Sequence, residues 1–304
     1  MNHDEWAAGQ MTTTVTVDGH DLAVAYRDDG PGSYDDPGSH DGSGGLDSDG
    51  DDAGGTDGPP IVFLYGIPTW SFLWRDVAPA IAADRRVVVP DLLGYGNSTT
   101  ADGFDRSIRA QEAMLAALLE ELDIGTVSIV AHDIGGGVAL RYAAHRPDAV
   151  ARLVCSNAVC YDSWPVEFIT NLGLPGTTET PLEDLEERVS SAFTLGAYGD
   201  PDPAFVEGLT APWLSAEGRT SLARCAVTTN TNHTTEIDYD AITADFLGLW
   251  GAGDDFQPIE YGERLAADLD GGVVGLNETY HWVMADRPEA YVDELREFLE
   301  PGAG

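Results

Sequence analysis

The chain has 304 residues, and its 53 acidic side chains against 15 basic ones give a net charge of −38. Such a charge excludes nucleic acid and anionic membranes as favoured partners, because both are negatively charged themselves. With 43% hydrophobic residues the chain is apolar enough to bury a sizeable core, so it is not disordered as a whole, and its length allows one large domain, with or without an insertion.

The first predicted elements are a β-hairpin and an acidic loop. Apolar and polar residues alternate through residues 12–27 on both sides of Asp18–Gly19, which is a hairpin signal. Residues 28–60 hold ten Asp and many Gly, Ser and Pro, so they bury too little apolar surface to offset the entropy of ordering. We expect a flexible, solvated loop there. We expect no calcium site, because its Asp-Gly pattern lacks the Glu that closes an EF-hand loop.

Short apolar runs then alternate with helical patterns. Such runs fit strands that are covered on both faces, and helices are predicted over residues 105–122 and 288–299 from their apolar stripes. The alternation predicts an α/β fold with a mostly parallel sheet. The predicted strands after the hairpin are residues 61–65, 86–91, 127–132, 152–157, 245–250 and 272–276.

Residues 161–239 interrupt this alternation. They contain short helical stretches and several Pro but no apolar strand run. We predict that they form a helical cap over the carboxyl edge of the sheet, where α/β proteins bind ligands. The expected division is therefore a core of residues 1–160 and 240–304, which includes the acidic loop, and a cap of residues 161–239.

Asp133 stands where the predicted strand 127–132 turns into a helix. The surrounding sequence AHDIG matches the Gly-x-nucleophile-x-Gly pattern of a strained strand-to-helix turn, with Ala in place of the first Gly. The following helix points its positive N-terminal end at Asp133, which stabilises a carboxylate there. On the pattern alone, Asp133 is equally well interpreted as a helix N-cap.

Two more residues favour a catalytic interpretation of Asp133. Asp254 follows the predicted strand 245–250, and His281 lies in the loop before the last helix. The chain order of nucleophile, acid and base is that of the α/β-hydrolase triad. Asp255 is the alternative acid, since it follows Asp254 directly. We therefore predict that Asp133, Asp254 and His281 meet at one edge of the sheet.

Longer motifs resemble the haloalkane dehalogenase and epoxide hydrolase branch of the α/β-hydrolase superfamily. They are FLYGIPTWSFLWRDVAP, RRVVVPDLLGYGNS, VSIVAHDIGGGVALRYAAHRPDAVARLVCSNAV, LWGAGDDFQP and HWVMADRPEAYVDELREFL. The resemblance covers nearly the whole chain except the acidic loop and much of the cap. It implies the α/β-hydrolase fold, with a mostly parallel eight-stranded sheet, helices on both faces and a helical cap insertion.

The resemblance also implies roles for individual residues. Asp133 matches the nucleophile, Asp254 the acid and His281 the base. The backbone N–H groups of Ile67 and Ile134 match the oxyanion hole. No metal and no cofactor belong to this pattern.

Some positions depart from the dehalogenase pattern. Ile134 replaces a Trp, and Ile67 replaces an Asn or Glu, whose side chains contact the departing halide in many dehalogenases. Asn157 occupies the position from which some dehalogenases take their acid, and because it cannot ionise it supports Asp254 in that role. The candidate pocket residues are Trp70, Trp164 and Trp213 as alternative halide donors and Tyr161 and Tyr198 as proton donors to an epoxide.

These residues describe a hydrolase. A carboxylate is already ionised at neutral pH, so Asp133 needs no base to attack sp³ carbon, and water activated by His281 then hydrolyses the resulting alkyl ester. We expect a haloalkane dehalogenase-like enzyme whose partners are a small apolar substrate and water. The alternatives are an epoxide hydrolase and a non-catalytic binding protein with the same fold.

The remaining sequence features concern the cellular environment. Three cysteines form no disulfide framework, the first ten residues lack the basic and apolar regions of a signal peptide, and no run of 18 apolar residues exists. We therefore expect a cytoplasmic protein. The acidic composition, with Arg as the only basic residue besides His, resembles that of proteins from halophilic archaea.

The charge predicts that stability depends on salt. At about 0.1 M KCl the screening length is about 10 Å, and at about 1 M it is about 3 Å, so repulsion among the excess carboxylates weakens as salt rises. The melting temperature is expected to increase steadily over this range when it is followed by tryptophan fluorescence. A melting temperature that does not change with KCl would contradict the proposed adaptation to salt.

Overall fold

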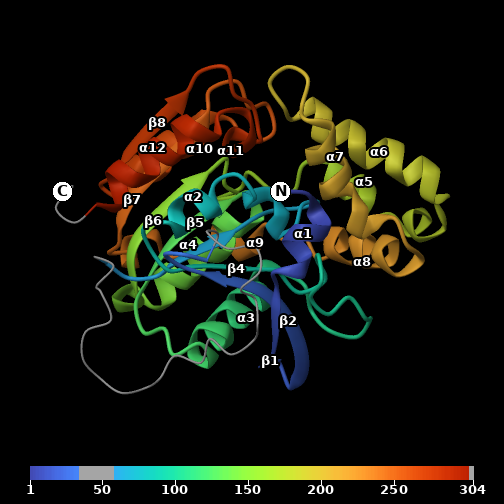
Figure 1. Ribbon diagram of the computed structural model, residues 1–304, viewed down its shortest axis with the longest axis horizontal. Helices are drawn as coiled ribbons and strands as arrows, with labels where there is room; N and C mark the ends of the chain where they lie inside the picture. The colour runs from blue at the N-terminus through green and yellow to red at the C-terminus, as the bar shows by residue number, and fades with distance from the viewer. Residues whose placement is uncertain (34–57, 301–304) are drawn as a thin grey trace.

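An eight-stranded sheet forms the centre of the molecule (Figure 1). The computed structural model describes residues 1–33 and 58–300, so most of the predicted acidic loop lies outside the described residues. The strands are β1 (Met11–Val17), β2 (His20–Asp29), β3 (Ile61–Leu64), β4 (Val87–Pro90), β5 (Val127–His132), β6 (Val150–Ser156), β7 (Asp245–Gly251) and β8 (Gly272–Leu276).

The strand order is β1-β2-β4-β3-β5-β6-β7-β8. Strands β1 and β2 form the predicted hairpin, and β2 pairs antiparallel with β4. From β4 to β8 every neighbouring pair is parallel. The predicted α/β fold with a mostly parallel sheet is therefore confirmed, and the hairpin forms its antiparallel edge.

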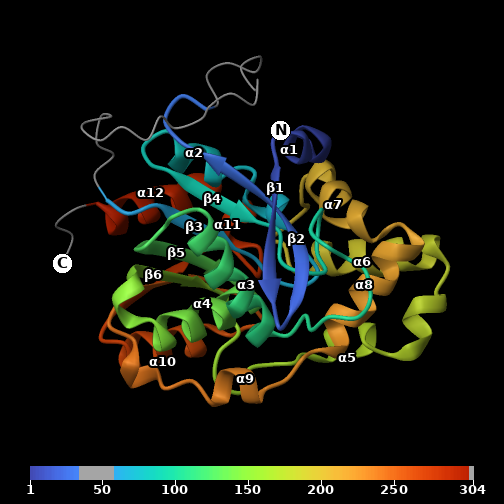
Figure 2. The same cartoon turned by 90° about the horizontal axis from the view of Figure 1, so that it is seen from below.

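Helices cover both faces of the sheet, which explains why its central strands are apolar throughout. Every residue of β3, β4 and β5 is buried, as expected of strands with helices above and below. Figure 2 shows α2 and α12 on one side of the sheet and α3, α4 and α10 on the other. The helices outside residues 161–239 are α1 (His3–Ala8), α2 (Ala78–Ala82), α3 (Ile108–Glu121), α4 (Ile134–His145), α10 (Ile259–Asp268), α11 (Val283–Asp286) and α12 (Pro288–Leu299), with 3-10 helices η1 (Ser71–Trp74) and η2 (Pro147–Ala149).

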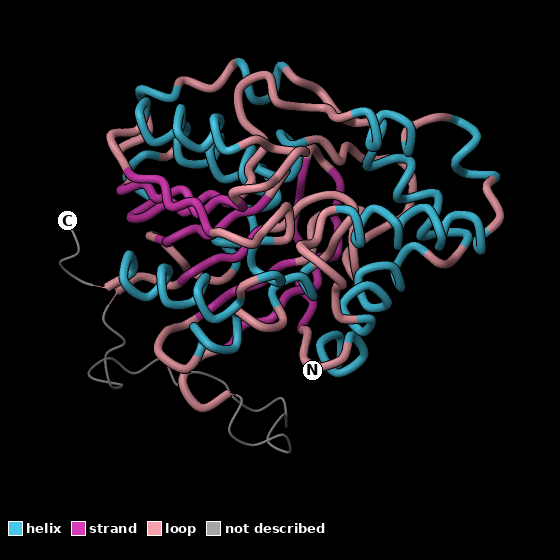
Figure 3. Tube along the Cα trace, turned by 90° about the horizontal axis from the view of Figure 1, so that it is seen from above, coloured by secondary structure: helices cyan, strands magenta, loops and turns pink. Residues whose placement is uncertain are grey.

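Residues 161–239 are helical, and they lie beside the sheet (Figures 1 and 3). Helix α9 (Asn232–Thr235) of this segment contacts α4 in the core. That residues 161–239 form a separate domain stays a prediction. Among the described residues no helix is long and apolar enough to cross a membrane. The elements of this segment are α5 (Glu167–Leu172), η3 (Pro175–Glu179), α6 (Leu182–Leu195), α7 (Pro203–Thr210), η4 (Ala211–Trp213), α8 (Ala216–Val227), α9 (Asn232–Thr235) and η5 (Tyr239–Ala241).

Candidate active site

A strained turn at Asp133 joins β5 to α4. Asp133 has φ 50° and ψ −125°, a conformation that costs free energy for a residue other than glycine. Its carbonyl oxygen accepts hydrogen bonds of 2.9 Å from the N–H groups of Gly136 and Val159. A Cβ at Gly135 would lie 2.7 Å from the carbonyl oxygen of Tyr65, so the helix can start this close to β3 only with glycine. These contacts hold the Asp133 side chain at the end of the strand.

The backbone around Ile67 receives the Asp133 carboxylate. The N–H of Ile67 donates a 2.9 Å hydrogen bond to Asp133 Oδ1, and the N–H of Ile134 also bonds to this side chain. A Cβ at Gly66 would lie 2.0 Å from the same oxygen, so glycine is required for this close approach. The two N–H groups that the sequence analysis assigned to an oxyanion hole thus face one carboxylate.

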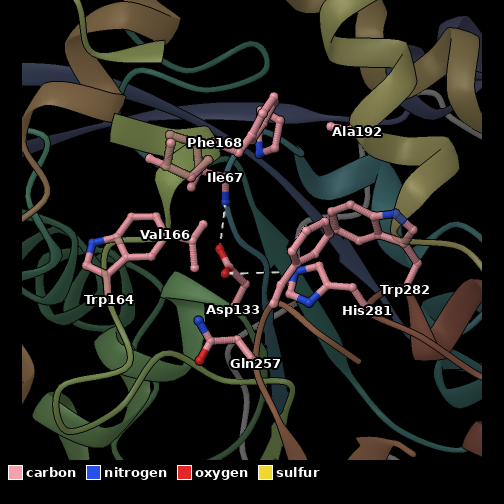
Figure 4. Close-up of a pocket in the computed structure, with 12 residues that line it drawn as sticks. Ile67, Asp133, Trp164, Val166, Phe168, Ala192, Gln257, His281 and Trp282 are labelled. Carbon is pink, nitrogen blue, oxygen red and sulfur yellow. Dashed lines mark hydrogen bonds and ion pairs between the residues drawn. The ribbon is translucent and has the colours of Figure 1, made fainter. Parts of the chain in front are cut away.

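The structure brings the three predicted triad residues together (Figure 4). His281 Nε2 lies 3.9 Å from Asp133 Oδ2, and His281 Nδ1 lies 2.8 Å from Asp254 Oδ2. All three residues are at most 6% exposed. Asp255, the alternative acid, is exposed to solvent. The geometry therefore selects Asp254 as the partner of His281.

Asn157 lies beside Asp254. Its Nδ2 donates a 2.5 Å hydrogen bond to Asp254 Oδ2, and its Oδ1 accepts one of 3.1 Å from the N–H of Gly251. The N–H of Phe256 donates to the other carboxylate oxygen, Oδ1, at 2.8 Å. Asp254 is thus surrounded by donors on both of its oxygens, which fixes the carboxylate that faces His281.

A largely apolar pocket opens at Asp133 and His281. It encloses about 390 Å³ of space not filled by atoms, part of it open to solvent. Within the described part of the chain, Asp133 and His281 are the only charged or titratable side chains in its wall, and Gln257 contributes its only side-chain amide. The lining residues are Ile67, Pro68, Asp133, Trp164, Val166, Phe168, Ile169, Ala192, Phe256, Gln257, His281 and Trp282.

Of the five predicted pocket residues, the lining includes only Trp164. The indole N–H groups of Trp70 and Trp213 donate to the carbonyl oxygens of Gly208 and Pro68. These two side chains are therefore buried packing residues with no N–H left to stabilise a halide.

The two predicted tyrosines are also absent from the pocket lining. The Tyr161 hydroxyl donates a 2.6 Å hydrogen bond to Asp268 Oδ2, and the Tyr161 ring stacks on that of Tyr239. Tyr198 is 46% exposed and packs edge-on against Tyr280. Neither hydroxyl is placed to protonate a substrate beside Asp133.

Comparisons with known proteins agree with this architecture. An α/β-hydrolase fold family model matches residues 59–178. A solved α/β-hydrolase fold protein from Burkholderia ambifaria superposes with a TM-score of 0.75 at 26% identity, covering 93% of this chain and 96% of that one. The chain therefore has the α/β-hydrolase fold.

Several proteins that are similar to this chain are haloalkane dehalogenases. One from Mycolicibacterium paratuberculosis is 41% identical over 108 residues, which are 35% of this chain and 36% of the relative. Haloalkane dehalogenase 2 from Mycobacterium bovis is 28% identical over 253 residues, 76% of this chain and 85% of the relative. The chain therefore matches the Mycolicibacterium paratuberculosis protein, the one with the higher identity of these two, over only about a third of that protein's length.

Burial gives the candidate site unusual acid–base properties. Burial raises the pKa of Asp133 to about 6, although the charge of His281 and the N–H groups of Ile134 and Ile67 oppose it. Burial lowers the pKa of His281, but the charge and hydrogen bond of Asp254 and the charge of Asp133 outweigh it, so the net pKa is raised. Ionised Asp133 and neutral His281 are thus both favoured by mildly alkaline pH.

Sequence reasoning missed several residues of the site. Phe256, Gln257 and Trp282 line the pocket, and the His132 ring lies 4.6 Å from that of His281. Burial and the charge of His281 hold the pKa of His132 well below its usual range, so His132 is neutral. All of them stand within the motifs that carry the family resemblance, but the resemblance attached no role to them. Within the described residues no group of three or more His, Cys, Asp or Glu is arranged to hold a metal ion.

The raised pKa of Asp133 predicts that Asp133→Asn stabilises the fold at neutral pH. A carboxyl group with a pKa of about 6 when folded and about 3.9 when unfolded binds its proton more tightly in the folded state. This tighter binding stabilises the folded state fully below about pH 4, and the stabilisation is lost as pH rises through about 6. The loss lowers the free energy of unfolding by about 3 kcal/mol. Asn stays neutral, so it avoids this loss.

Urea unfolding of wild type and Asp133→Asn at about pH 5 and about pH 8 checks this prediction. The advantage of the variant should be about 1.5 kcal/mol at the lower pH and approach about 3 kcal/mol at the higher one. An advantage that is the same at both values would show that the Asp133 carboxyl titrates as it does in water.

Proposed function

We propose that this protein is a hydrolase that uses Asp133 as its nucleophile and forms an alkyl ester on that side chain. The observation that carries the proposal is the placement of a carboxylate at the strained turn. One of its oxygens accepts the Ile67 N–H, and the other faces His281, which in turn contacts Asp254. A residue that only capped α4 would accept a hydrogen bond from the N–H of Gly135 or Gly136, and the Asp133 side chain makes no such capping bond.

The geometry supports a two-step reaction. In the first step an Asp133 oxygen attacks sp³ carbon, and the leaving group departs with the bonding electrons. In the second step His281 takes a proton from water, and the hydroxide formed adds to the ester carbon of Asp133. The N–H groups of Ile67 and Ile134 stabilise the oxyanion. The tetrahedral intermediate then collapses, and the alcohol leaves with the proton returned from His281. Asp133 is left as the carboxylic acid and becomes a carboxylate again when it releases its proton to solvent.

A small apolar substrate fits the walls of the pocket. The lining side chains are aliphatic or aromatic apart from Asp133, His281 and one amide. Among the described residues no Arg lines it, so a substrate with its own carboxylate would find no partner and would be repelled by Asp133. Together with the dehalogenase relatives, this supports a neutral haloalkane as the substrate and water as the second reactant.

Epoxide opening is the second candidate, and the structure makes it less favourable. The opening oxygen of an epoxide needs a proton donor such as a tyrosine hydroxyl. Tyr161 donates to Asp268 instead, and Tyr198 packs against Tyr280 outside the pocket. A purely binding role would not require Asp254 and His281 to be aligned behind Asp133.

A panel of 1-bromoalkanes, 1-chloroalkanes and 1,2-epoxyalkanes tests the proposal. Halide release and diol formation are measured for wild type and for Asp133→Ala in high salt. We expect bromide release by wild type well above chloride release, because bromide is the better leaving group, and no turnover above background by the variant. Hydrolysis that survives in Asp133→Ala would contradict a nucleophilic role for Asp133.

A further inference from the structure

We infer that the side-chain amide of Gln257 donates the hydrogen bond that stabilises the departing halide. The inference rests on the proposed function and adds the residue that replaces the missing halide donors. At the two positions where many dehalogenases have a side chain that contacts the halide, this chain has the aliphatic residues Ile67 and Ile134. A donor therefore has to come from elsewhere in the pocket wall.

The other N–H groups of the lining are committed or face away. The Trp282 indole donates a 2.9 Å hydrogen bond to the Phe193 carbonyl oxygen. Figure 4 shows the nitrogen of Trp164 on the side of its ring that is remote from Asp133. The backbone N–H groups of Ile67 and Ile134 face the Asp133 carboxylate itself. Among the lining side chains, Gln257 is the one uncharged donor that remains.

Gln257 is buried with most of its hydrogen-bonding capacity unused. Its side chain is 1% exposed, yet the structure gives its amide one hydrogen bond, a long one of 3.4 Å from Nε2 to the Ser163 carbonyl oxygen. Its Oε1 is buried without a partner. An amide has two donor hydrogens and two acceptor sites, and leaving such a group unsatisfied in the interior costs free energy. A structural amide would be better satisfied.

The position of Gln257 suits a role at the reacting carbon. Gln257 and Asp133 line the same pocket, and in the view of Figure 4 the amide nitrogen points toward the side of Asp133 and the amide oxygen away from it. The Ser163 contact sets this orientation, because a carbonyl oxygen accepts only from the nitrogen end of the amide. The loop is fixed at its backbone as well, since the Trp250 indole donates a 2.7 Å hydrogen bond to the Gln257 carbonyl oxygen. One Nε2 hydrogen is directed to Ser163, which leaves the second for a group bound in the pocket that Gln257 lines.

The chemistry of an amide selects a halide over an epoxide. When Asp133 forms its bond to carbon, the carbon–halogen bond breaks and the halide takes both electrons. The halide needs a hydrogen bond but no proton, and the amide N–H supplies this without changing its protonation. The alkoxide from an epoxide must gain a proton, and an amide is far too weak an acid to give one.

Leaving-group dependence tests the inference. Gln257→Met keeps the length of the side chain and removes the donor. It is made in the His281→Gln background, so that the rate of ester formation on Asp133 is read by rapid quenching and intact mass. For a 1-chloroalkane the rate should fall by about 10²-fold, the loss typical of removing one such donor. For the matching 1-iodoalkane the loss should be several-fold smaller, because iodide needs less stabilisation.

Stability provides the second measurement. Because Gln257→Met replaces a poorly satisfied buried amide with an apolar group, the melting temperature should stay the same or rise. Ile169→Val is the matched control, since Ile169 lines the same pocket without a polar atom, and it should slow the chloride and iodide substrates equally.

Two results would overturn the inference. Equal slowing of all halides by Gln257→Met, or a marked loss of stability, would make Gln257 a residue that only shapes the pocket. If the His281→Gln protein forms no adduct even with an iodoalkane, the nucleophilic role of Asp133 fails, and the leaving-group role of Gln257 is refuted with it.

Discussion

Replacing His281 with Gln is expected to preserve the first half of the reaction and to block the second. Attack by Asp133 needs no base, because its carboxylate is ionised above a pKa of about 6. Hydrolysis of the ester needs His281 to take a proton from water, and losing such a base costs about 10²- to 10⁴-fold in rate. Turnover should fall by this factor, and intact-mass spectrometry should show one alkyl group on Asp133.

His132→Asn is the matched control for this experiment. His132 is a second buried histidine beside His281, and its Nδ1 lies 3.0 Å from the carbonyl oxygen of Ser156, a contact that the Asn amide can keep. It does not line the pocket, so no ester should accumulate in this variant. Accumulation in His132→Asn, or full turnover by His281→Gln, would show that His281 is not the base.

The fold was predictable where the sequence carries a strong periodic signal. The runs at β3, β4 and β5 are buried on both faces, so apolar residues follow one another without interruption. Helix α1 gives no comparable signal, because it has only six residues. It is held by tertiary contacts, in which Trp6 is fully buried and donates a 2.9 Å hydrogen bond to Ser71 Oγ.

The candidate triad was predictable because each residue follows a strand that the sequence already reveals. Parallel strands bring their carboxyl ends to one edge, so Asp133 after β5 and Asp254 after β7 meet there, and His281 in the loop after β8 joins them. This reasoning needs only the order of the strands and the spacing of the loops.

The pocket was much harder to predict, because aromatic side chains with polar tips serve packing and binding equally well. Nothing in the sequence shows that the Trp213 indole bonds to Pro68 or that the Tyr161 hydroxyl bonds to Asp268. Gln257 was missed although it stands in the motif LWGAGDDFQP, since a single amide in a loop indicates no role by itself. Its significance is visible only from its burial in the pocket that Asp133 also lines and from its oxygen, which has no hydrogen-bond partner among the described residues.

Replacing Asp254 with Asn should reduce turnover by about 10⁴-fold, the size of effect seen when the acid of a catalytic triad becomes an amide. The N–H groups of Phe256 and Asn157 and the Nδ1 atom of His281 all contact the Asp254 carboxylate. An amide at this position has only one oxygen, so its NH₂ group must face at least one donor. If it faces His281, the proton moves to Nε2, and that nitrogen can no longer accept a proton from water.

Asp255→Asn separates the loss of this contact from a general change of charge in the loop. Asp255 is adjacent in sequence but exposed, so its substitution removes the same charge without touching His281, and turnover should stay within about twofold of wild type, as is usual for surface changes. Because the defect in Asp254→Asn lies in water activation, the alkyl group on Asp133 should persist in that variant as it does in His281→Gln. Slow turnover without a persistent adduct would instead mean that Asp254 acts before the ester forms, by setting the charge that Asp133 carries when it attacks.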